Sequence, residues 1–206
     1  SQGVGRINIT FIDVQYIELF GGPAGELDTL AAWTRITAAN TTSIQLSGSG
    51  TADRSGNGQA VYHGPEPTSP TDELQFVMSQ ANLTGGKGIS FAFRCGIDND
   101  WSGYEIWAQP DGWNLVRRFG QYAPSNVEWL GGGPRAIDES GINPAIQPVR
   151  VRVTFPTADN IVIDAFNGTQ WVSLFNVVDA TYATGPVGLF AQYPATDCSI
   201  HEVRVL

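Results

Sequence analysis

The chain is poor in charged residues, and in lysine above all. Only 15% of its 206 residues are charged, against about 25% in typical soluble domains, and Lys87 is the one lysine. The formal net charge is −9, so we expect no nucleic-acid partner and no binding to an anionic membrane, because both surfaces would repel the chain. The low charge content also indicates that many strand faces are covered, by a second sheet or by another chain.

Long apolar runs and cysteines are scarce too. No stretch approaches the roughly 18 apolar residues that a membrane span needs, and no leader pattern opens the sequence, so we expect a soluble protein. Cys95 and Cys198 are the only cysteines, which gives neither a metal-ligand spacing nor a redox pair. Two interpretations stay open: a disulfide that closes a long loop and stabilises by about 4–5 kcal/mol, or two buried thiols that pack as small apolar groups.

The sequence does contain short alternating segments separated by turns, most clearly over residues 88–206. Val149, Val151 and Val153 share one face of an expected strand, while arginines take the other face, as a half-buried strand requires. Pro-Asp-Gly at 110–112 and Asn-Gly at 167–168 are typical turn sequences. This pattern predicts an all-β protein, in which two antiparallel sheets pack as a β-sandwich.

The first 20 residues stand apart from the rest of this pattern. We expect an N-terminal arm or first strand over residues 1–20 and a single domain over residues 21–206. Ile7, Ile9 and Phe11 alternate within the arm, and a free apolar arm needs a sheet edge to pair with. These three residues therefore either dock onto a partner chain or form the first strand of the domain's own sheet.

The order of these features resembles the concanavalin A-like lectin/glucanase (LamG-like) jelly roll. The matching elements are Leu-x-x-Trp at 30–33, a Gly-to-Arg strand at 88–94, Gly-Tyr-Glu-Ile at 103–106, and the Gly-Pro-Val-Gly sequence at 185–188 that precedes the closing strands. The resemblance covers residues 25–206, and it is specific for the fold rather than for an activity.

Within that superfamily the sequence is most similar to small jelly-roll domains of bacteriophage minor tail or head-decoration proteins. This resemblance implies a virion structural protein, located in the extracellular particle, that forms a homo-oligomer, binds other virion proteins and also contacts surface glycans. The alternative function is that of a secreted carbohydrate-binding module.

Catalytic motifs are missing from the expected strands. Glycanases that this fold resembles share a Glu-x-Asp-x-x-Glu motif on one strand. Retaining hydrolysis needs two carboxyl groups about 5–5.5 Å apart. The corresponding strand here carries Glu105 followed by Trp107 and Gln109. The two histidines, His63 and His201, are far apart in the sequence. We therefore predict no enzymatic activity.

Two ligand classes remain to be weighed. Asp98, Asn99 and Asp100 form an oxygen-rich loop that suits calcium, although the same residues also make ordinary turns, and we predict no metal or other cofactor.

Aromatic residues give the second ligand class, because sugar rings stack on exposed indoles. Alternation places Trp107 on the face opposite Tyr104 and Ile106, where it would be exposed beside Arg94 and Arg118. The predicted glycan-binding residues are Arg94, Trp107, Trp113 and Arg118. The competing interpretation is that the tryptophans belong to the core or to a protein interface.

Overall fold

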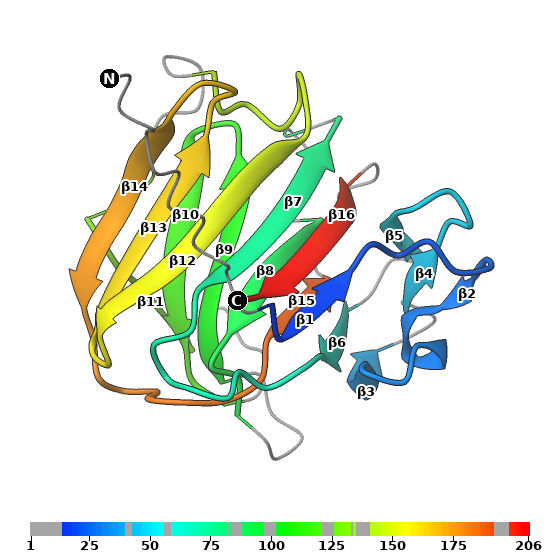
Figure 1. Cartoon of the computed structure of the whole chain (residues 1–206), viewed down its shortest axis with the longest axis horizontal. Helices are drawn as coiled ribbons and strands as arrows, with labels where there is room; N and C mark the ends of the chain where they lie inside the picture. The colour runs from blue at the N-terminus through cyan, green and yellow to red at the C-terminus, as the bar shows by residue number, and fades with distance from the viewer. Residues whose placement is uncertain are drawn as a thin grey trace, which may run out of the picture.

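The computed structural model describes residues 14–39, 43–55, 59–81, 83, 88–96, 102–120, 126–132, 134, 141–191 and 198–206. The regular structure of these residues is almost entirely strand, with a short 3₁₀ turn, η1 (Leu27–Thr29), near the start of the domain. Their strands form two antiparallel sheets that face each other (Figure 1), so the predicted all-β sandwich is confirmed. Within the described ranges, no helix is long and apolar enough to cross a membrane.

The larger sheet forms the front layer in Figure 1. Its nine described strands lie in the order β14 (Trp171–Val178), β13 (Asn160–Phe166), β12 (Val149–Thr157), β7 (Leu74–Gln80), β16 (Cys198–Val205), β5 (Ala52–Ser55), β4 (Ser43–Leu46) and β2 (Gly25–Glu26), while β1 (Tyr16–Glu18) pairs with the far end of β16. Strand β1 lies within residues 1–20, so the end of the expected arm adds a strand to the domain's own sheet.

The smaller sheet lies behind it. Its seven described strands lie in the order β11 (Val127–Trp129), β10 (Gly112–Arg118), β9 (Gly103–Gln109), β8 (Ile89–Phe93), β15 (Gly188–Ala191), β6 (Gln59–His63) and β3 (Thr34–Ala39). Strands β9 and β10 form a hairpin in which Gln109 pairs with Gly112, which places the turn at the predicted Pro-Asp-Gly sequence.

The core lies between the two sheets. On β12, buried and partly exposed residues alternate as predicted, with Val149, Val151 and Val153 facing inward. Phe76 on β7 stacks across the interface on Phe91 of β8, with ring centroids 4.4 Å apart. The alternation of the sequence therefore encodes the inner face of the larger sheet directly.

The two cysteines are not bridged. Cys95 and Cys198 are buried thiols outside any disulfide, which confirms the interpretation as apolar thiols. Burial raises the pKa of Cys198 to about 12, so its thiol is unreactive at neutral pH.

The predicted docking residues Ile7, Ile9 and Phe11 lie outside the described residues.

The connection from β14 to β15 crosses the end of β8 at close range. Gly185 has φ +136°, and a Cβ at this position would meet the backbone of Arg94 and Cys95. The N–H of Cys95 donates to the carbonyl of Pro186 at 3.0 Å. Only glycine fits this approach, which gives a structural reason for the Gly-Pro pair.

Candidate functional site

One face of the smaller sheet points away from the core, and we call it the free face. Tyr104 and Ile106 of β9 belong to the core, so Glu105 and Trp107 between them point to the free face, as the alternation predicted. The side chains of the free face that matter below are Ser90, Glu105, Trp107, Asn114, Arg118 and Trp129.

A buried ion pair lies on the free face. The Nε of Arg118 donates to Glu105 Oε2 at 2.9 Å, and a second guanidinium nitrogen contacts the same oxygen. Ser90 donates its hydroxyl to the other carboxylate oxygen at 2.5 Å. Both charged side chains are almost completely shielded, at 1% and 0% exposure. The pair is thus a fixed part of the sheet.

Trp107 is not exposed, so this part of the sequence prediction is wrong. Its relative exposure is 0%. Alternation indicated the correct face, but that face is covered around Trp107. Among the described strands of this face, the exposed indole is that of Trp129, which lies on β11 at the edge of the sheet and is 50% exposed. The two rings are in contact, with centroids 5.8 Å apart and planes inclined by 58°.

Trp113 and Arg94 do not lie on the free face. Trp113 points into the core, where its indole N–H donates to the carbonyl of Ile142 at 3.0 Å. The four predicted glycan-binding residues therefore do not form one surface: only Trp107 and Arg118 share the free face, and both are buried.

Arg94 joins three loops at the end of the sandwich. The backbone at Arg94 has φ +51°, so the alternation of β8 ends there. Its guanidinium donates to the carbonyls of Ala158, Tyr182 and Pro70 at 2.7, 3.1 and 2.8 Å and lies 3.9 Å from the centre of the Phe155 ring. Every one of these contacts is internal, so the geometry gives Arg94 a structural role.

Asn114 supplies an unused acceptor on the free face. Its side-chain N–H donates to the carbonyl of Gly112 at 2.8 Å. The residue is fully buried, and among the described residues its Oδ1 has no hydrogen-bond partner. Asn114 pairs in register with Trp107, and Val116, two residues on, pairs with Trp129. This acceptor therefore lies one step from the tryptophan pair.

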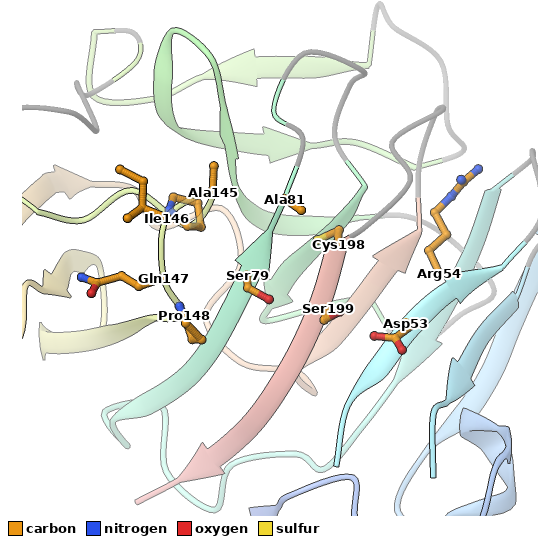
Figure 2. A pocket seen from close by; sticks show the side chains of 11 residues that line it. Asp53, Arg54, Ser79, Ala81, Ala145, Ile146, Gln147, Pro148, Cys198 and Ser199 are labelled. Carbon is orange, nitrogen blue, oxygen red and sulfur yellow. The ribbon is translucent and has the colours of Figure 1, made fainter. Parts of the chain in front are cut away.

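The larger sheet has an open groove on its outer face (Figure 2), which the sequence did not indicate. Its volume is about 460 Å³. Figure 2 shows the ends of β7 and β16, with Ser79 and Ser199, between β5 on one side and residues 144–148 on the other. Buried and partly exposed residues alternate along β7, and Ser79 is one of the partly exposed ones. Nothing in the sequence links Ser79 to the residues of β5 and β16 that it meets here.

A serine and a histidine interact beside this groove. Ser79 Oγ and His201 Nε2 share a hydrogen bond, 2.8 Å apart. Burial lowers the pKa of His201, and the nearby Asp53 carboxylate opposes this shift in part. The imidazole is therefore neutral at neutral pH.

Metal binding and catalysis each need particular groupings of side chains. No cluster of three histidine, cysteine or acidic side chains suited to a metal occurs among the described residues. The calcium-loop residues Asp98, Asn99 and Asp100 lie outside them. On the described strands of the free face Glu105 is the one carboxylate, and Arg118 pairs with it; the predicted absence of enzymatic activity stays a prediction.

Comparisons with known proteins show the fold. No family model matches the sequence, and no curated protein matches it. Among solved structures, the carbohydrate-binding module CBM66 from Bacillus subtilis is similar, with 13% identity, a TM-score of 0.53, and coverage of 84% of this chain and 93% of that one.

Two further structures share the sandwich. The exoplasmic/lumenal domain of VIP36, in its Ca²⁺/Man2-bound form, matches with 10% identity, a TM-score of 0.59 and coverage of 92% and 85% of the two chains. A protein from Mycobacterium abscessus named as a β-glucanase matches with 15% identity, a TM-score of 0.57 and coverage of 94% and 100%. At identities this low, the matches show that the chain shares their two-sheet β-sandwich fold and nothing finer.

Proposed function

We propose that this protein binds carbohydrate, with the sugar stacked on the exposed indole of Trp129. The observation that carries the proposal is the half-exposed Trp129 ring, held against the buried Trp107 at the edge of the free face. An indole fixed in this way offers a flat apolar surface at little entropic cost, because its orientation is already set.

Two structural neighbours support the same class of ligand. The CBM66 structure is described as a carbohydrate-binding module, and the VIP36 domain as a Ca²⁺/Man2-bound form, which supports carbohydrate as the ligand of this chain.

The virion role predicted from the sequence receives no support from the structural neighbours. It stays a prediction, as do the homo-oligomer, the virion protein partners and the location in an extracellular particle. No feature of the described residues favours that role over sugar binding.

A glycan array tests the proposal. The labelled wild-type protein is expected to bind at least one glycan class, and Trp129→Ala is expected to weaken that binding by roughly tenfold or more, because the stacking contact is lost. Trp171→Ala is the matched control, since Trp171 lies partly exposed on β14 of the other sheet and stacks under Arg152. Binding that survives Trp129→Ala, or an array with no bound glycan, would contradict the proposal.

A further inference from the structure

We propose that the groove on the outer face of the larger sheet is a second ligand site, which takes a neutral polyhydroxylated ligand such as a saccharide. It is built from β5, the ends of β7 and β16, and residues 144–148, none of which touches Trp129 on the other sheet. The choice of a saccharide rests on the proposed function; the existence of the site rests on the geometry of the groove.

A row of polar side chains crosses the groove. Ser199 on β16 pairs in register with Asp53 on one side and with Ser79 on the other. Residues paired in register point to the same face, with neighbouring Cβ atoms about 4.5–5.5 Å apart. The sheet thus presents a carboxylate and two hydroxyl groups in one line, a set that can both accept from and donate to sugar hydroxyls.

The Asp53 carboxylate can accept a further hydrogen bond. One oxygen of Asp53 accepts a hydrogen bond from the Thr51 hydroxyl at 3.1 Å. The other, Oδ1, is shielded and has no hydrogen-bond partner among the described residues. A shielded acceptor without a donor is unfavourable, and a ligand hydroxyl that reaches the carboxylate from the groove would supply a donor.

The charge of the groove favours a neutral ligand over a cation. Arg54 follows Asp53 on β5 and balances its charge, and Figure 2 shows the Arg54 side chain extending away from the carboxylate. His201, which hydrogen-bonds Ser79, has a pKa that burial lowers. Asp53 is the one acidic residue among those that line the groove, so a compact cation would lack the several oxygen ligands it needs, whereas a sugar hydroxyl needs a single acceptor.

The opposite wall is apolar and well anchored. Residues 144–148 contribute Ile146, which is 79% exposed, and Pro148. The segment is tied to β7 by the N–H of Gln80, which donates to the carbonyl of Pro144 at 2.9 Å. The Gln147 amide donates to the carbonyl of Gly141 at 3.0 Å. A fixed apolar wall opposite a polar row suits the C–H face and the hydroxyl edge of a sugar ring.

Amide chemical shifts measured by NMR can test this site without interference from the first. In the Trp129→Ala variant, the methyl glycosides of mannose, glucose and galactose are titrated at millimolar concentration. At least one is expected to shift the amides of Asp53, Ser79 and Ser199 saturably. Asp53→Ala should weaken this binding about tenfold, while Asp111→Ala, at an exposed position in the β9–β10 turn, should leave it unchanged.

A second variant guards against loss of folding. Ser199→Val removes the central hydroxyl and narrows the floor with a residue that strands favour, so it should abolish the shifts while the melting temperature stays near that of the parent. The inference is overturned when none of the three sugars moves these amides, or when the shifts persist in both variants. If array binding depends on Trp129 but no sugar shifts the groove amides, the second site alone is contradicted. If a sugar shifts the groove amides but array binding does not depend on Trp129, the Trp129 proposal alone is contradicted.

Discussion

Replacing Glu105 by glutamine should destabilise the protein strongly, although the side chain keeps its size and its bond to Ser90. In the native structure the Arg118 guanidinium and the Glu105 carboxylate are 1% and 0% exposed and share a two-point contact. Glu105→Gln removes the negative charge and leaves the positive one buried. The amide oxygen can still accept from Ser90, so the change isolates the charge.

The expected loss is about 3–5 kcal/mol, the cost of removing one partner from a buried ion pair. For a chain of this size each kcal/mol lowers the melting temperature by about 2–4 °C, so a drop on the order of 10 °C is expected. A surface pair provides the contrast: Glu26 and Arg35 lie 3.1 Å apart with side chains 41% and 28% exposed. Glu26→Gln should therefore cost less than about 1 kcal/mol.

Urea denaturation, followed by tryptophan fluorescence, measures these differences as shifts of the midpoint at constant slope. The double variant Glu105→Gln/Arg118→Met removes both charges and should recover most of the stability that the single variant lost, because apolar replacement of a whole buried pair is often close to neutral. If Glu105→Gln costs no more than Glu26→Gln, or if the double variant is less stable than the single one, the reasoning about the free face is wrong.

Two other predictions concern the backbone and pH. Gly185→Ala should destabilise by more than about 3 kcal/mol, because its Cβ would meet the backbone of residues 94–95, whereas Gly168→Ala, with a similar positive φ but open space around it, should cost only about 1 kcal/mol; thermal melts of both variants give the comparison. The folded-state pKa of His201 is lowered by burial, so its contribution is fully present above the unfolded value of about 6.5 and is lost as pH falls below it. Wild type should lose more stability than His201→Gln between neutral pH and pH 5 in urea titrations, and equal losses would refute the assignment.

The sequence predicted which side chains face the core wherever one face of a strand is buried and the other is exposed to solvent. Strand β12 shows this, because its valines and arginines alternate in both sequence and burial. The pattern failed at Arg94, where a positive φ of 51° ends the alternation. A single residue with a left-handed backbone carries no signal in the surrounding sequence when it is not glycine.

The site was harder to predict than the fold, for a different reason. Alternation assigned Trp107 to the correct face, but periodicity gives the direction of a side chain and not what lies above it. The groove was missed because Asp53, Ser79 and Ser199 are brought together only by pairing of β5, β16 and β7. Such non-local pairing leaves no local motif.

The low charge content of the chain now has a structural cause, and it limits where ligands can bind. Strands β8, β9, β10 and β15 are buried along almost their whole length, on both faces, an arrangement less usual for antiparallel sheets than one wet face. Charged residues are unfavourable in strands that are buried on both faces, unless they pair as Glu105 and Arg118 do. The two proposed sites lie outside these four covered strands, one at the sheet edge where Trp129 is exposed and the other on the outer face of the larger sheet.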